Sequence, residues 1–402
     1  MPKHTGDEVT LRVVESLGDI ARADWDACAR AAAPPGADGT PGYNPFVSHD
    51  FLWSLEQSGC ATEATGWRGL HLVVDGADGR PQAIAPVYLK THSQGEYVFD
   101  HGWAHAYERV GGRYYPKLQV SVPFTPATGP RLLVRAGTEA ERATLRRVLV
   151  AGLSTLARQN RISTVHATFL ESPDVEAFEA ADWLPRTDKQ FHWHNRGYRD
   201  FDDFLGSFAS RKRKQVKRER REAAEGVEIL RLTGKAITEA HWDAFYAFYM
   251  DTGGRKWGRP YLNRRFFSLV GERMADDILL VMVAREGRFI AGALNFIGSD
   301  ALYGRNWGAI EDRPFLHFEA CYYQAIEFAI ERGLARVEAG AQGEHKLARG
   351  YLPETTHSAH FVTDPGFRAA IERYLTEERR EVARVGEALA EASPYRRDLE
   401  DF

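Results

Sequence analysis

The segment from Phe289 to Pro353 constrains the fold of this chain more than any other part of it. It opens with FIAGALNFIGSDALYGRNWGAI, an apolar stretch with small residues that predicts two strands joined by a short turn. A long amphipathic helix is predicted next, in EDRPFLHFEACYYQAIEFAIERG, and a third strand follows in LARVEAG. The segment ends in a loop crowded with glycine and polar side chains, GAQGEHKLARGYLP. This order of elements predicts an α/β domain built on a mixed sheet.

The first half of the chain repeats this order. HLVV and PQAIAPVYLK flank a polar turn, as LLVMVA and FIAGALNFIG do later, and Gly79-Arg80 matches Gly287-Arg288. A predicted helix and strand at residues 138–170 then correspond to those at 318–340. The first half also carries an insertion at about residues 100–130. A repeat of this size predicts two copies of one domain rather than a solenoid. We place the copies at residues 1–195 and 196–402.

Composition agrees with two ordinary globular domains. The chain has 402 residues, of which 44% are hydrophobic, so each half can bury a core. A net charge of −4 gives no global attraction to nucleic acid or anionic membrane. Three widely spaced cysteines argue against a disulfide framework or a cysteine metal site. We find no export signal and no apolar stretch near 18 residues, and we therefore expect a cytoplasmic protein with no membrane span.

Three stretches together resemble the FemAB-like branch of the GNAT acyltransferase superfamily, which is described as peptidoglycan biosynthesis/recognition. They are GALNFIGSDALYGRNWGA, LHFEACYYQAIEFAIERGL and GAQGEHKLARGYLP. The first-half stretch FVSHDFLWSLEQSG is similar to the same group, and the resemblance covers roughly residues 44–370. It implies tandem GNAT-like acyltransferase domains. It implies much less about the substrate, because one fold hosts many functions.

The end of the second predicted strand is one candidate donor site. GNAT domains hold the pyrophosphate of CoA with backbone N–H groups where a strand turns into a helix, in a loop of the form Arg/Gln-x-x-Gly-x-Gly/Ala. The run Arg305, Asn306, Trp307, Gly308 fits the first part of this pattern. Ile310 departs from it, and the following Glu311 and Asp312 add negative charge. His317, at the start of the long helix, is a candidate donor contact or second base.

The polar loop that follows the third strand is the second candidate. Glycine allows the backbone to approach a ligand closely, and Gly343 stands in this loop. Gln342 and Lys346 are predicted donor contacts, and Glu344 or His345 is the predicted general base. Tyr351 or Asn306 is predicted to assist the oxyanion or the leaving group. No nucleophilic serine or cysteine motif appears, so direct attack by a bound amine is the simpler mechanism.

The inserted segment of the first half is dense in histidine and aromatic residues. We expect it to form the wall of a substrate cleft, with these substrate-binding candidates: His101, Trp103, His105, Tyr107 and Phe124. Histidines four residues apart can also ligate a metal, but no further ligand pattern supports this, and we predict no metal.

A basic run opens the second half. Residues 211–222 hold eight basic and two acidic side chains on a predicted helix that ends at Gly226. Such a run is either a solvated helix face or a surface for tRNA or another phosphate-rich ligand, through residues 211–221.

These observations favour an N-acyltransferase that moves an acyl group from a thioester, acyl-CoA, to the amine of a small molecule or peptide. The first alternative is a Fem-like aminoacyl transferase that uses aminoacyl-tRNA and acts on a cell-wall precursor, which the basic run and the departure at Ile310 favour. The second alternative is a non-catalytic module that recognises peptidoglycan.

Overall fold

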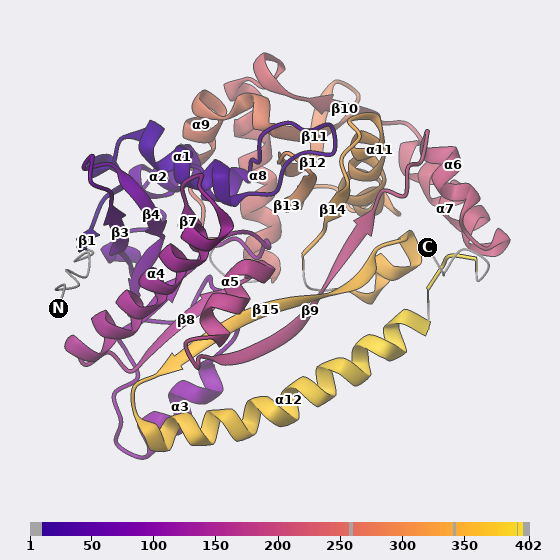
Figure 1. Ribbon diagram of the computed structural model, residues 1–402. Helices are drawn as coiled ribbons and strands as arrows, with labels where there is room; N and C mark the ends of the chain where they lie inside the picture. The colour runs from indigo at the N-terminus through magenta and orange to yellow at the C-terminus, as the bar shows by residue number, and fades with distance from the viewer. Residues whose placement is uncertain (1–9, 257–259, 341–342, 392, 397–402) are drawn as a thin grey trace, which may run out of the picture. The chain divides into compact units, whose positions relative to one another are not determined.

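The computed structural model describes residues 10–256, 260–340, 343–391 and 393–396 (Figure 1). The chain forms two compact units. Unit 1 comprises residues 1–33, 46–187 and 357–378, and unit 2 comprises residues 34–45, 188–356 and 379–402. The predicted domain boundary at 195/196 stays a prediction, since each unit also contains segments from the other half of the chain.

Unit 1 holds two groups of strands with the orders β1-β3-β4-β7 and β2-β5-β6-β8-β15. Its elements are β1 (Leu11–Val14), α1 (Arg22–Ala32), α2 (His49–Gln57), β2 (Trp67–Gly69), β3 (His71–Asp75), β4 (Pro81–Ala85), β5 (Val87–Lys90), α3 (His101–Arg109), β6 (Lys117–Val120), β7 (Leu133–Val134), α4 (Glu139–Gln159), β8 (Thr164–Thr168) and α5 (Ser172–Glu179).

Unit 2 holds strands in the order β10-β11-β12-β13-β14-β9. Its elements are α6 (Phe201–Gly206), α7 (Ser210–Ala224), β10 (Glu228–Leu232), α8 (Glu239–Lys256), α9 (Arg264–Arg273), β11 (Ile278–Arg285), β12 (Arg288–Ile297), β13 (Ala301–Ala309), α10 (Leu316–Phe318), α11 (Gln324–Glu331) and β14 (Arg336–Glu338). The chain passes between the units within β9 (Leu184–His194), β15 (Leu352–Val362) and α12 (Pro365–Glu391).

Short helical turns complete the chain. A π-helical turn (Glu319–Tyr323) joins α10 to α11. The 3-10 turns are η1 (Leu17–Asp19), η2 (Pro45–Val47), η3 (Glu63–Thr65), η4 (Gly234–Ala236), η5 (Ala275–Asp277) and η7 (Glu344–Arg349).

The two units share one order of strand pairing, which agrees with tandem GNAT-like domains. In unit 1, β3 and β4 form an antiparallel hairpin, β6 pairs parallel with β8, and β8 pairs antiparallel with β15. In unit 2, β11 and β12 form the hairpin, β13 pairs parallel with β14, and β14 pairs antiparallel with β9. Gly79 and Gly287, in the matching hairpin turns, both have a φ of 74°, a region that glycine enters without strain.

The last strand of each unit comes from the other half of the sequence. β9 follows the first-half elements but pairs with β14, and β15 follows the second-half elements but pairs with β8. Hydrophobic pattern does not encode this exchange, because a buried strand has the same composition in either sheet.

Two further differences from the sequence prediction have local causes. The predicted strand PQAIAPVYLK divides at Pro86 into β4 and β5, since proline has no N–H group to continue a ladder. The predicted insertion at about 100–130 contains β6, which pairs with both β5 and β8. β6 is therefore part of the sheet, while α3 lies before it and the residues that lead to β7 follow it, and the predicted insertion itself stays a prediction.

Helices begin where their caps predict. The Ser48 side chain accepts a hydrogen bond from Phe51 N (3.3 Å) at the start of α2. Thr138 and Glu141 form a capping box at the start of α4. Gly226 has a φ of 67° and follows Glu225, the C-cap of α7, so the helix ends at this glycine as predicted.

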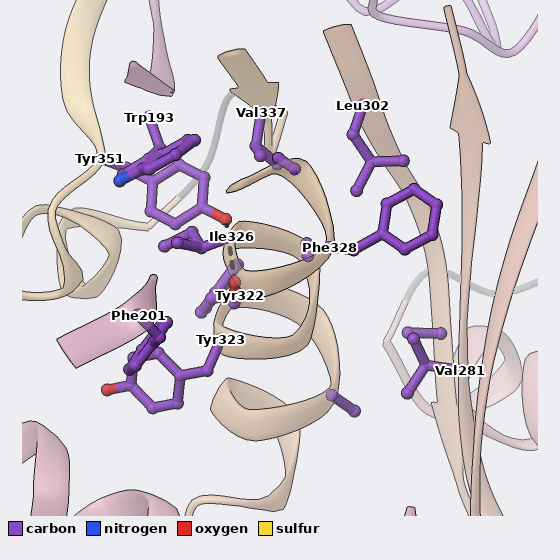
Figure 2. Close-up of a cluster of buried hydrophobic side chains, with 14 of the residues drawn as sticks. Trp193, Phe201, Val281, Leu302, Tyr322, Tyr323, Ile326, Phe328, Val337 and Tyr351 are labelled. Atoms are coloured by element: carbon purple, nitrogen blue, oxygen red, sulfur yellow. Dashed lines mark hydrogen bonds between the residues drawn. The ribbon is translucent and has the colours of Figure 1, made fainter. Parts of the chain in front are cut away.

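The core of unit 2 lies between its sheet and the helical stretch from α10 to α11. Buried residues of β11, β13 and β14 face buried residues of this stretch, as Val281, Leu302, Val337, Ile326 and Phe328 illustrate (Figure 2). α8 packs against β12 and β13. This packing fixes the helical stretch that carries the tyrosines of the candidate site.

Candidate active site

The candidate site begins where β13 and β14 part. The two strands pair only over residues 301–303 and 336–338, while β13 continues to Ala309 with β12 still beside it. From Gly304 onwards, the edge of β13 that faced β14 has no strand partner among the described residues. A strand edge without a partner strand can offer backbone groups to a ligand, although Ala309 N on this stretch donates to Thr252 Oγ1 (3.2 Å).

The π-helical turn places two consecutive tyrosines against different partners. Tyr322 and Tyr323 are 4% and 0% exposed. The Tyr323 hydroxyl donates to Glu219 Oε2 (2.5 Å), whereas Tyr322 Oη and His345 Nε2 are joined by a hydrogen bond of 3.0 Å. Turns of this kind inside α-helices are frequent at functional sites.

Five side chains gather around this hydrogen bond, and we call them the His345 cluster: Trp307, His317, Phe318, Tyr322 and His345. The ring centroid of His317 lies 5.3 Å from those of Trp307 and Tyr322 and 6.1 Å from that of His345. The Phe318 ring lies 5.5 Å from the His345 ring. His345 is exposed, so its imidazole, bonded to the Tyr322 hydroxyl, is accessible to solvent and is surrounded by aromatic side chains.

The structure thus brings together three residues that the sequence predicted, Trp307, His317 and His345. Sequence reasoning missed Tyr322 and Phe318, because they read as the apolar face of an amphipathic helix. Burial raises the pKa of Tyr322 far above its usual range, so its hydroxyl stays protonated and can donate.

Gly343 has a clear role beside His345. Its φ is 108°, and a Cβ atom there would lie 2.3 Å from His345 Cε1. Only glycine leaves room for the imidazole to fold back over the loop at this point. Its predicted contact to a donor stays a prediction.

A buried ion pair fixes the position of the His345 segment. Arg349 Nη2 donates to both carboxylate oxygens of Glu219, at 2.9 Å each, and Arg349 Nη1 donates to His345 O (2.6 Å). The Arg349 guanidinium also lies 3.4 Å from the centroid of the Phe318 ring. Glu219 is on the inner face of α7, so the basic helix and the His345 segment are tied together by bidentate charge-assisted bonds.

Lys346 points away from the His345 cluster. Its ammonium group donates to the carbonyl oxygens of Ala339 (2.5 Å) and Gly340 (3.0 Å) at the end of β14. The side chain is only 4% exposed, and this burial lowers the pKa of Lys346 to about 8. It therefore anchors the loop to the end of β14.

Lys346 makes a pH-dependent contribution to stability. The fold disfavours its charged form, since its pKa falls from 10.5 unfolded to about 8 folded. Its contribution to the free energy of unfolding thus rises as pH increases from about 8 to 10.5. We expect the free energy of unfolding of wild type, relative to that of Lys346→Met, to rise by roughly 3 kcal/mol over this pH range. Urea unfolding of both proteins at pH 7.5 and 10.5 measures this; an unchanged difference would contradict the assignment.

Other predicted residues of unit 2 lie apart from the cluster. Tyr351 is fully buried behind Tyr322, with ring centroids 5.4 Å apart, and its hydroxyl donates to Tyr322 O at 3.4 Å (Figure 2). It supports Tyr322 from the core and does not reach the open side of the site. The prediction that Tyr351 contacts the oxyanion or the leaving group is therefore wrong, and Tyr351 instead packs behind Tyr322.

The β13 residues divide between two faces of the sheet. Asn306 and Gly308 share one face and Trp307 lies on the other, because side chains alternate along a strand, whereas Arg305 is the extra residue of a β-bulge opposite Leu294 and Asn295. A Cβ atom at Gly308 would lie 2.3 Å from the backbone of Phe248, so this glycine allows α8 to pack closely. Asn306 and Gly308 therefore lie on the α8 face, away from the His345 cluster, and the run 305–308 is strand rather than a turn into a helix.

Two of the predicted site residues cannot be placed relative to the cluster. Gln342 lies outside the described residues, as does the side chain of Glu344. Their predicted roles as donor contact and general base stay predictions.

The predicted substrate-binding residues of unit 1 do not form one surface. His101 and His105 are exposed on α3, whereas Trp103 is 6% exposed and packs 5.0 Å from the His360 ring. Tyr107 stacks on Phe367 with centroids 4.3 Å apart. Phe124 is 5% exposed and packs edge-on against Trp67 at 5.2 Å. Trp103, Tyr107 and Phe124 therefore serve mainly as packing residues of unit 1.

Unit 1 contains a buried group of charged and titratable side chains that the sequence did not predict. We call it the Lys117 cluster: Lys90, Glu96, Asp100, Lys117 and His166. Lys117 Nζ donates to Glu96 Oε2 (2.6 Å) and to Asp100 Oδ2. Lys90, Lys117 and their carboxylate partners are at most 4% exposed. Burial raises the pKa of Glu96 to about 7 and lowers that of Lys90 to about 7. Burial also lowers the pKa of His166 to about 3, so this imidazole is neutral.

The basic helix α7 is amphipathic by charge. Val216, Glu219 and Ala223 face inward, while five cations are exposed: Arg211, Lys214, Lys217, Arg218 and Arg221. Lys217 pairs with Asp202 (2.8 Å) and Arg218 with Glu222 (3.6 Å). Arg211, Lys214 and Arg221 make no ion pair with any other described residue, and they stand at i, i+3 and i+10 on one stripe.

Within the described ranges, no three His, Cys, Asp or Glu residues are grouped to hold a metal ion. A search of the same residues finds no helix with the length and hydropathy needed to cross a membrane.

Comparison with known proteins identifies the family of the chain. The family model described as peptidoglycan biosynthesis/recognition matches residues 16–397. The chain therefore belongs to the FemAB-like family, and it is an enzyme of the acyl or aminoacyl transferase class. No curated protein sequence matches the chain.

Several solved structures are similar in fold. The crystal structure of FemX matches with a TM-score of 0.54 and 13% identity, over 88% of this chain and 98% of FemX. A tandem GNAT protein from the clavulanic acid biosynthesis pathway gives 0.47 and 14%, over 89% and 99%. L-PGS from Bacillus licheniformis gives 0.49 and 11%, over 83% and 98%. The FemX match agrees with tandem GNAT-like domains.

Proposed function

We propose that this enzyme transfers an aminoacyl group from aminoacyl-tRNA to an amine of a peptidoglycan precursor, at the His345 cluster. The single observation that carries this proposal is the hydrogen-bonded pair of His345 and Tyr322 beside the parted strands β13 and β14. The description of the family as peptidoglycan biosynthesis/recognition supports a peptidoglycan acceptor.

His345 acts as the general base in this scheme. The acceptor amine attacks the ester carbonyl carbon, a C–N bond forms, and the C–O bond to the tRNA ribose breaks. His345 takes the proton that the amine loses and passes it to the departing ribose oxygen. In the tautomer in which His345 Nε2–H donates to Tyr322 Oη (3.0 Å), this hydrogen bond orients the imidazole and the lone pair of Nδ1 takes the proton. Backbone N–H groups on the open edge of β13 are the candidate partners of the developing oxyanion.

The charge distribution favours a tRNA donor. The exposed stripe of α7 carries cations that have no ion-pair partner among the described residues, and Glu219 on the inner face of the same helix bonds to Arg349 of the His345 segment. A phosphate backbone bound along the outer face would thus lie on the helix that also holds the catalytic segment. Asp312, before α10, would repel a pyrophosphate at that position, whereas the carboxylate of Glu311 is paired with Arg288 (2.7 Å) and Arg285 (3.3 Å).

An acyl-CoA donor is the second candidate. The parting of β13 and β14 favours it, because a slender pantetheine-like arm can bond the open backbone edge of β13. We expect transfer from aminoacyl-tRNA to depend on the cations of α7 much more strongly than transfer from acyl-CoA.

Charge reversal on α7 separates the two donors. We expect Arg211→Glu, Lys214→Glu and Arg221→Glu together to lower kcat/KM for aminoacyl-tRNA roughly 100-fold, with a shallower salt dependence, because several phosphate contacts are lost. Steady-state transfer from charged tRNA at several salt concentrations measures the effect.

The matched control is the triple reversal of exposed arginines on α12, Arg373→Glu, Arg380→Glu and Arg384→Glu, which should leave transfer within about twofold. Full activity of the α7 variant with aminoacyl-tRNA would contradict the tRNA surface. Efficient transfer from acyl-CoA, at the same rate in wild type and in the α7 variant, would favour the second candidate.

A further inference from the structure

Unit 1 contains a small hollow that takes no part in the proposed transfer reaction. Its volume is about 200 Å³, and its chemically active lining consists of six side chains: Glu15, Glu56, Glu63, Arg68, His71 and Tyr88. They come from the ends of β1 and α2, from η3, and from β2, β3 and β5. All of them belong to unit 1, whereas the His345 cluster belongs to unit 2.

His71 is the most informative of these residues. Its side chain is 0% exposed, and neither ring nitrogen has a hydrogen-bond partner in the part of the chain that the structure describes. The rings of Trp25 (5.6 Å) and Tyr88 (5.3 Å) pack edge-on around it. Burial lowers the pKa of His71 to about 3, so it presents one N–H donor and one nitrogen acceptor. Buried polar groups are seldom left unpaired, so a partner inside the adjoining hollow is expected.

Tyr88 adds a second polar group without a partner. The side chain is 3% exposed, and its hydroxyl bonds to no other described residue. Burial, reinforced by the charge of Glu56, holds the pKa of Tyr88 well above its usual range. The phenol therefore remains neutral and can either donate or accept a hydrogen bond inside the hollow.

The charge of the lining is negative. Glu15 pairs with Arg68 (2.8 Å), and Glu56 accepts from Leu17 N (2.9 Å) and from the Ser16 hydroxyl. Glu63 is exposed and makes no ion pair with any residue in the described part of the chain. Three carboxylates thus face one guanidinium, and a neutral imidazole adds no positive charge. A cation is favoured over an anion or a neutral molecule.

The cation is organic rather than a metal ion. No three metal-binding side chains are grouped here or elsewhere among the described residues. The lining also includes Leu17, Leu52 and Ala61, which suit a short apolar chain. Because a water-sized group takes about 30 Å³, the hollow accommodates roughly six or seven heavy atoms.

We propose that this hollow binds a small primary ammonium compound of the size of a short alkylamine or diamine. The ammonium group donates to the carboxylate of Glu56 or Glu63 and to the free nitrogen of His71. The Tyr88 hydroxyl completes the polar end, and the alkyl chain lies against the apolar lining.

Calorimetric titration of the full chain with n-butylamine and 1,4-diaminobutane at pH 7.5 tests this site. Saturable binding of at least one ammonium probe is expected, whereas 1-butanol and butyrate should give no saturable heat. Tyr88→Phe and Glu63→Gln should each weaken binding about 5- to 10-fold, by removing a hydrogen bond or a charge. The matched controls Tyr374→Phe and Glu108→Gln, at exposed positions outside the hollow, should change affinity less than twofold.

Three outcomes would overturn the proposal. No saturable heat with either ammonium probe would mean that ordered water alone fills the hollow. Equal binding of butyrate would exclude selection by charge. Undiminished affinity in the double variant Tyr88→Phe/Glu63→Gln, with an unchanged melting temperature, would place the ligand elsewhere. Glu63 is exposed, so Glu63→Gln is expected to fold even where Tyr88→Phe does not.

Discussion

Replacing His345 with alanine is expected to lower kcat for transfer about 100- to 10,000-fold, the range that a positioned general base contributes. The imidazole is exposed beside the parted strands and is held by Tyr322 Oη at 3.0 Å. No other histidine of the described residues bonds to Tyr322, and the ring centroid of His317 lies 6.1 Å from that of His345, too far to take over the same proton without movement. Single-turnover transfer with saturating donor isolates the chemical step from substrate binding.

Two companion variants make this result specific. Tyr322→Phe keeps the ring and its packing but removes the hydroxyl, so we expect a smaller loss, about 10-fold, in the same step. His194→Ala removes a half-exposed histidine of β9 that pairs with Glu354 (2.8 Å), and it should retain activity within about twofold. If His345→Ala kept more than a third of wild-type turnover, the base would have to be another group, and Glu344 would be the next to replace.

Replacing Lys117 with methionine is expected to lower the free energy of unfolding of unit 1 by about 3–5 kcal/mol. The variant leaves Glu96 and Asp100 buried, at 4% and 2% exposure, without the cation that bridges them. Among the described residues, Glu96 Oε1 and Asp100 Oδ1 have no hydrogen-bond partner, and Lys90 Nζ, 3.9 Å from Glu96 Oε1, and the Tyr114 hydroxyl, which donates to Asp100 Oδ2 (2.6 Å), compensate only in part. Urea unfolding followed by far-UV circular dichroism measures the loss.

The pH dependence of that loss has a definite sign. Burial raises the pKa of Glu96 to about 7, and loss of the Lys117 charge would raise it further. Glu96 is then protonated at pH 5 in the folded variant, so the penalty is smaller there than at pH 8. The triple variant Lys117→Met/Glu96→Gln/Asp100→Asn should recover at least half of the lost stability. Equal losses at both pH values would contradict a role for the Glu96 charge.

Much of the fold was predictable because its signals are local. The matching hairpins, the Gly79 and Gly287 turns and the Ser48 cap depend on residues close in sequence, and the structure confirms them. The exchange of β9 and β15 was not predictable, since pairing between distant strands leaves no local pattern. The break at Pro86 had a signal, because an internal proline rarely continues a central strand.

Part of the candidate site was also predictable from signals that are local in the sequence. His345 and His317 stood out as polar residues in a glycine-rich loop and at a helix start. Tyr322 was hidden, because a tyrosine on an amphipathic helix usually packs in the core, and only the π-helical turn directs it towards His345. Lys117 and Glu96 were hidden too, because charged residues are expected at the surface unless a partner is known.

The most direct test of the central proposal is the mass of an amine-bearing peptidoglycan precursor after incubation with the enzyme and charged tRNA. We predict that wild type adds one aminoacyl residue in amide linkage, and that His345→Ala adds none in the same time. An unchanged precursor with wild type, while acyl-CoA acylates the same amine, would contradict the aminoacyl-tRNA donor. An unchanged precursor with either donor would contradict the assignment of acceptor and reaction together.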